Sequence, residues 1–192
     1  NLSGRRLTHS LTLLKAELQG LFKTAPVILL LSTAALLLQL SPELQTQLDL
    51  RFANLTYGSA WRLASCHLLH WSWNHCVWDA VVFVTAGVLC ESRWPEACRR
   101  MLFWSGGLIP LVVLQAEPEL LCYRGLSGVD SALFALAAGM LLQDEWRRGR
   151  RPTAAVAGLA VVCQFLKIAA EIHVGQTLFV SDRSFVPVPL SH

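Results

Sequence analysis

Long stretches almost free of charged residues are the feature that most constrains this sequence. Five of them lie at residues 24–42, 63–90, 101–116, 125–143 and 152–170, and three of these hold a single charge each, at Asp79, Asp130 or Lys167. A helix needs about 20 apolar residues to cross the hydrocarbon core of a bilayer. The sequence therefore predicts an all-α polytopic membrane helix bundle with five spans.

The composition leaves no room for a large extramembrane domain. Of the 192 residues, 54% are hydrophobic and 15% are charged, whereas about 25% of an average soluble domain is charged. We expect one membrane domain over residues 1–192, with residues 1–23 as a cytoplasmic amino-terminal segment. The third stretch is short, so we expect its helix to recruit flanking residues such as Leu120 and Leu121.

The positions of Lys and Arg predict the orientation of the spans. Most of these 16 residues lie before the first span and in the second and fourth connections, and short cytoplasmic loops accumulate such residues. The amino terminus is therefore expected in the cytoplasm, and residues 43–62, 117–124 and 171–192 on the outer face. The basic run at 147–151 follows from this topology, so we expect no nucleic-acid partner.

Four polar side chains interrupt the second apolar stretch, namely His67, His70, His75 and Asp79. Polar groups within spans are costly and mark candidate functional sites. On a helix, His75 and Asp79 share a face, whereas His70 is rotated about 140° from His75 and is expected to contact another helix or the outer loop. One helix does not bring the three histidines together, so histidines hydrogen-bonded between helices are favoured over a metal site.

The fourth stretch opens with Gly125, Ser127 and Gly128. We expect Ser127 to begin a helix, where free backbone N–H groups and the positive end of the helix dipole suit a developing oxyanion. The alternative is a seam of small residues at a helix contact.

Cysteine spacing does not indicate a metal site. The six cysteines include no C-x-x-C pair, so neither zinc nor a thioredoxin-like motif is expected. Cys66 and Cys122 both lie near the expected outer face, which leaves a disulfide between them as one alternative.

Taken together, these motifs resemble the rhomboid intramembrane serine proteases. Trp61, Arg62, His70, His75 and Asp79 fall in the W-R-x7-H-x4-H-x3-N register of that family without a gap, although Asp79 stands where the family usually has asparagine. Residues 125–128 supply its G-x-S-G motif. The resemblance covers about residues 61–135.

The resemblance implies peptide-bond hydrolysis by a Ser/His dyad without a cofactor. Ser127 would be the nucleophile and His192 the general base, with His173 as the second candidate for the base. His192 would begin a sixth transmembrane helix that continues after it. The remaining implied roles are oxyanion binding and support for His75, Asp79, Gly125 and Gly128, and structure for Trp61, Arg62 and His70.

Within that family, the sequence most resembles the rhombosortase subgroup. Residues 73–75, residues 123–128 and the Pro189 to His192 ending resemble it. It implies transmembrane substrates with a glycine-rich carboxy-terminal anchor of the GlyGly-CTERM type, in the bacterial inner membrane.

Two other classes of function stay open. A noncatalytic rhomboid-like protein would bind transmembrane clients without cleaving them, and Asp79 in place of asparagine favours it, because a carboxylate donates a hydrogen bond only when protonated. A histidine-liganded membrane cytochrome or metal transporter would use His67, His70 and His75.

Overall fold

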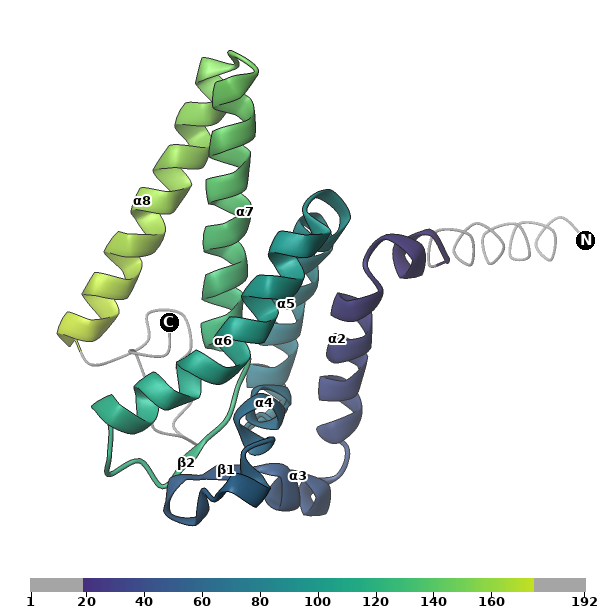
Figure 1. Cartoon of the computed structure of the whole chain (residues 1–192), viewed down its shortest axis with the longest axis vertical. Coiled ribbons are helices and arrows are strands. Elements are labelled where there is room, and N and C mark those ends of the chain that lie inside the picture. The colour runs from purple at the N-terminus through teal and green to yellow at the C-terminus, as the bar shows by residue number, and fades with distance from the viewer. Residues whose placement is uncertain (1–18, 175–192) are drawn as a thin grey trace, which may run out of the picture.

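The computed structural model describes residues 19–174, which form an all-α bundle (Figure 1). Four long helices follow a shorter one, and an irregular layer of short elements connects the first two. The elements are α2 (Pro26–Leu38), α3 (Pro42–Leu48), β1 (Leu50–Arg51), η1 (Phe52–Asn54), η2 (Tyr57–Ser59), α4 (Arg62–Ser65), η3 (Cys66–Leu68), α5 (Trp73–Arg93), α6 (Pro95–Ala116), β2 (Cys122–Tyr123), α7 (Ser127–Arg147) and α8 (Arg151–Val174).

Three helices within residues 19–174 are long and apolar enough to cross a membrane, namely α5, α6 and α8. The helices α2 and α3 satisfy the same criteria only as a pair, and they are bent by 116° where they meet. The helix α7 is not among the candidates, because Asp130 and the charged residues of its last turns lower its hydropathy. By length and composition the described residues thus provide three or four of the five expected spans.

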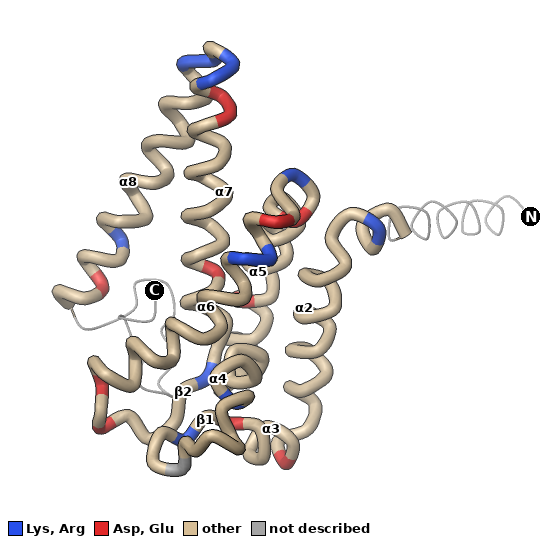
Figure 2. Tube along the Cα trace, in the orientation of Figure 1, with Lys and Arg blue, Asp and Glu red and all other residues tan. Residues whose placement is uncertain are grey.

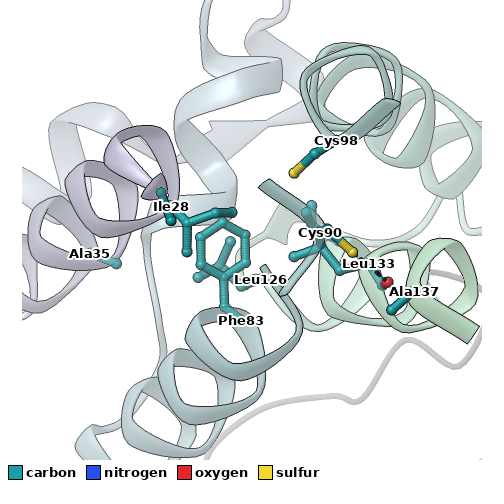
Figure 3. Close-up of a cluster of buried hydrophobic side chains, with 10 residues drawn as sticks. Ile28, Ala35, Phe83, Cys90, Cys98, Leu126, Leu133 and Ala137 are labelled. Carbon is teal, nitrogen blue, oxygen red and sulfur yellow. Dashed lines mark hydrogen bonds between the residues drawn. The ribbon is translucent and has the colours of Figure 1, made fainter. Parts of the chain in front are cut away.

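Helix α7 lies at the centre of the bundle and contacts α5, α6 and α8, while α2 packs against α5 (Figure 1). The hydrophobic core joins α2, α5, α6 and α7 around buried residues such as Ile28, Phe83, Leu126 and Leu133 (Figure 3). This central position explains why α7 tolerates polar residues, since its neighbours shield them from lipid.

Helix α2 approaches α5 closely at its first turn. A Cβ atom added at Gly87 would lie 2.5 Å from Cδ1 of Ile28, so only glycine leaves room for that side chain. The buried carboxylate of Glu91 accepts hydrogen bonds from the backbone N–H groups of Val27 (3.1 Å) and Ile28 (2.9 Å). Glu91 therefore satisfies amides that have no partner within α2.

The second expected span begins later than the sequence predicted. Helix α5 starts at Trp73, because Ser72 is in an extended conformation and its side chain caps the helix by accepting from the His75 N–H at 3.2 Å. His67 and His70 consequently precede the helix.

The third helix also differs from its prediction. Helix α6 gains residues 95–100 at its start and ends at Ala116, and Leu120 and Leu121 lie outside it. Pro118 explains the end, since the residue before a proline is disfavoured in helical conformation.

Candidate active site

Ser127 is the first residue of α7, as the sequence predicted, and its side chain is half-buried. The preceding loop is tied to the outer layer by an antiparallel pair in which Leu50 lies opposite Tyr123 and Arg51 opposite Cys122. The chain then turns into the bundle through Gly125, whose φ of +126° lies in a region that side chains disfavour. The first turn of α7 thus follows a short, buried glycine turn.

This turn packs directly against His75. A Cβ atom added at Gly125 would lie 3.1 Å from Cε1 and 3.3 Å from Nε2 of the imidazole, and 3.7 Å from Oδ2 of Asp79. Glycine is therefore required at position 125 for two reasons: the backbone has a positive φ, and a side chain would collide with the His75 ring.

Asp79 is the centre of a buried polar cluster. Its Oδ2 atom lies 3.2 Å from Nε2 of His75 and 3.3 Å from Nε2 of His70, and it accepts the backbone N–H of Leu126 at 3.1 Å. The rings of the two histidines meet edge to face, with centroids 5.1 Å apart. His75 and Asp79 share a face of α5, as the spacing predicted. His70 reaches the same carboxylate because it lies in the loop before the helix and is not constrained by its geometry.

His67 lies apart from this cluster. Its Nδ1 atom is 3.2 Å from the carbonyl oxygen of Gly125, and its Nε2 atom is 3.2 Å from that of Gly106 in α6. Burial lowers the pKa of His67 below its usual value. Residues 19–174 contain no group of three His, Cys, Asp or Glu side chains able to hold a metal ion.

Asp49, which belongs to none of the sequence motifs, organises the outer layer beside the glycine turn. Its backbone oxygen accepts from Arg62 at 2.9 Å, and its buried carboxylate accepts from Arg124 at 3.1 Å. The Arg124 guanidinium also lies 4.6 Å from the ring centroid of Trp71, and that of Arg62 lies 5.2 Å from the centroid of Trp61. These contacts join the first connection to the segment that leads into Ser127.

Small residues of α7 line a groove of about 500 Å³ between α6 and α8. Gly128 and Ser131 belong to its floor, together with Ala132 and Ala135. Asp130 is buried, and its Oδ1 atom has no hydrogen-bond partner within the described part of the chain. Helix α7 therefore presents both a polar residue and a small-residue surface within two turns of Ser127.

The remaining candidates have simpler surroundings. Cys66 and Cys122 are free thiols in the described structure, and burial raises the pKa of each. Cys66 donates to the carbonyl of Leu63 at 3.2 Å. His173 is exposed in the last turn of α8, whereas His192 lies outside the described residues.

The family model for the Rhomboid domain matches residues 57–179. No curated protein and no solved structure matches the chain.

Proposed function

The chain belongs to the rhomboid family, whose members are generally intramembrane serine proteases, and we propose that it hydrolyses peptide bonds in transmembrane protein segments. It is an integral membrane protein with several apolar helices. In this proposal Ser127 attacks the scissile carbonyl, and His192 accepts its proton and later delivers it to the leaving amine. An imidazole suits both steps because its ordinary pKa is close to neutrality.

The position of Ser127 at the start of α7 is the observation that carries the proposal. The N–H groups of a first helical turn have no partner within the helix, and they point toward the positive end of its dipole. The Ser127 N–H would therefore donate to the oxyanion together with the His75 side chain, and each good donor contributes about 3 kcal/mol. The glycine turn supports this role by bringing His75 against the residues that precede Ser127.

Asp79 supports the site by orienting both the His75 ring and the start of α7. Its Oδ2 atom contacts the His75 ring and also accepts from the Leu126 N–H. A side chain that holds the ring and the helix start together keeps their donors at a fixed separation, which oxyanion binding requires.

His192 would reach Ser127 from the carboxy-terminal side. The helices α7 and α8 are antiparallel, so the end of α8 lies at the same end of the bundle as Ser127 (Figure 1). A helix carrying His192 at its start would find a packing surface in the groove over Gly128, Ser131, Ala132 and Ala135, because small residues allow close helix contacts in membranes.

The proposed substrate is a membrane anchor rich in glycine, at the carboxy terminus of an exported bacterial protein. Glycine has a poor helix propensity, so such a segment unwinds readily beside the nucleophile. Lys23 precedes α2, and Lys and Arg gather at the α5–α6 and α7–α8 turns at the same end of the bundle, whereas the basic residues of the opposite layer, Arg51, Arg62 and Arg124, each lie within 4 Å of the Asp49 carboxylate (Figure 2). The end with these turns would be cytoplasmic by the positive-inside rule, and Ser127, at the opposite end of α7, would work near the outer face of the inner membrane.

Replacement of Ser127 tests the proposal. Ser127→Ala should abolish cleavage of a glycine-rich tailed substrate in proteoliposomes and labelling by a fluorophosphonate probe, with unchanged thermal stability. Ser92→Ala is the matched control, because this serine is exposed and bonds only the Leu89 carbonyl among the described residues. Normal cleavage by Ser127→Ala would refute the assignment.

A noncatalytic client-binding function is the second candidate, and Asp79 favours it. Its Oδ2 atom accepts a backbone N–H here, whereas an oxyanion needs a donor. This function predicts that the wild-type protein retains tailed substrates uncleaved and that Ser127 does not react with the probe.

A further inference from the structure

His67 is a buried histidine that the proposed dyad does not use. It lies in η3, only 4% of its surface is exposed, and each ring nitrogen is 3.2 Å from a backbone carbonyl oxygen. The ring of Tyr123 meets it edge to face, with centroids 5.8 Å apart. His67 is thus held between β2, α6 and the glycine turn.

The Gly106 carbonyl needs a partner because of a proline. In a helix, the carbonyl of residue 106 accepts from the N–H of residue 110. Residue 110 is Pro110, which has no N–H. The Nε2 atom of His67 lies 3.2 Å from the Gly106 carbonyl oxygen, where the N–H of residue 110 would otherwise donate.

The Gly125 carbonyl, the second partner of His67, lies next to the candidate oxyanion site. It belongs to the same peptide unit as the Leu126 N–H, which donates to Asp79. The peptide is therefore held at its oxygen by His67 and at its nitrogen by Asp79. The next peptide along the chain carries the Ser127 N–H, so fixing the first peptide also orients this donor.

The two carbonyls compete for one proton. Because burial lowers the pKa of His67, its ring is neutral near pH 7 and has one N–H. A proton on Nδ1 bonds Gly125, and a proton on Nε2 bonds Gly106.

We propose that His67 is a positioning residue that donates from Nδ1 to the Gly125 carbonyl and thereby sets the orientation of the Ser127 N–H. This inference rests on the proposed protease function and assigns a further residue to the same site. It predicts that the bond to Gly125 controls turnover, while the bond to Gly106 affects only the stability of α6.

Three substitutions separate the two bonds. The amide nitrogen of His67→Asn can replace Nδ1, that of His67→Gln can replace Nε2, and His67→Phe replaces neither. We expect kcat to stay within about threefold of wild type in the Asn variant and to fall about tenfold or more in the Gln and Phe variants, with little change in KM. In a second background, Pro110→Ala supplies an N–H to Gly106. It should raise the thermal stability of His67→Phe without restoring kcat.

Hydrogen exchange tests the positioning without any cleavage. The amides of residues 124–127 should exchange about tenfold faster in His67→Phe and His67→Gln than in wild type and His67→Asn, measured by mass spectrometry in detergent micelles. An inactive wild type would refute the proposed function, and the exchange pattern would still decide the role of His67. Equal behaviour of the Asn and Gln variants, or recovery of kcat by Pro110→Ala, would overturn the inference.

Discussion

Substituting Gly125 with alanine should damage the site in two ways that can be measured separately. A residue with a side chain at φ +126° carries backbone strain of about 1–3 kcal/mol. The added Cβ would also approach His75 to 3.1 Å, and overpacking of this kind costs about 1–3 kcal/mol. We therefore expect the free energy of unfolding to fall by about 2–6 kcal/mol. Cleavage should fall about 100-fold, because small displacements of reacting groups are that costly.

Gly149 provides the matched control. It has a positive φ of +73°, but a Cβ there would meet no atom within 4 Å among the described residues. Gly149→Ala should lower the free energy of unfolding by about 1 kcal/mol through strain alone, and cleavage should be unaffected. Unfolding can be followed by tryptophan fluorescence during denaturant titration in mixed micelles, and cleavage with the tailed substrate in proteoliposomes.

The double variant identifies the contact. In a His75→Ala background the ring is gone, so Gly125→Ala should cost only the backbone strain of about 1–3 kcal/mol, without the cost of overpacking. Equal losses for the two alanine substitutions in the wild-type background would contradict the close packing of Gly125 on His75.

Four further outcomes are expected. Asp79→Asn should retain or increase cleavage, because its amide can donate to an oxyanion, and an inactive variant beside an active wild type would give the carboxylate a more specific role. His192→Ala should abolish cleavage and His173→Ala should not, measured by the same assay, and the reverse ranking would transfer the base to His173. Glu91→Gln should lower the free energy of unfolding by about 2 kcal/mol, because its amide has one oxygen and can accept from only one of the two backbone N–H groups of α2, with cleavage per folded molecule unchanged. Since burial lowers the pKa of His67, the unfolded chain gains a proton before the folded one below about pH 6.5, so stability should fall there, and unfolding of His67→Asn should show a smaller slope.

The parts of the fold that the sequence predicted are those that depend on local chemistry. The start of α7 at Ser127 follows from the flanking glycines, and the face shared by His75 and Asp79 follows from helical spacing. The limits of α5 were less predictable, because an apolar stretch can be a helix or a buried loop. The signal was present in Ser72, a residue type that favours the N-cap position.

Contacts between residues distant in sequence could not be predicted from spacing. Glu91 lies near the end of an apolar stretch, where a charged residue usually faces water, yet its carboxylate accepts from the N–H of Ile28, 63 residues before it in the first turn of α2. By sequence Asp49 is an ordinary acidic residue of the first connection, and only the fold brings Arg62 and Arg124 to it. The sequence contained the charges, but their pairing depends on which helices pack together.

Glu91, His67 and Asp79 are buried polar side chains that contact backbone groups lacking a partner within a helix. In hydrocarbon each backbone N–H and C=O needs a partner within the protein. Glu91 supplies one at the start of α2, and His67 supplies one where Pro110 interrupts α6. Asp79 does the same for the Leu126 N–H, but it also contacts His70 and His75, which makes it the residue that connects backbone satisfaction to the candidate oxyanion site. An asparagine there could keep the bond to the N–H through its oxygen and turn its amide toward substrate. An aspartate directs acceptors to both, so the donors to an oxyanion are left to the Ser127 N–H and the His75 side chain that Asp79 holds.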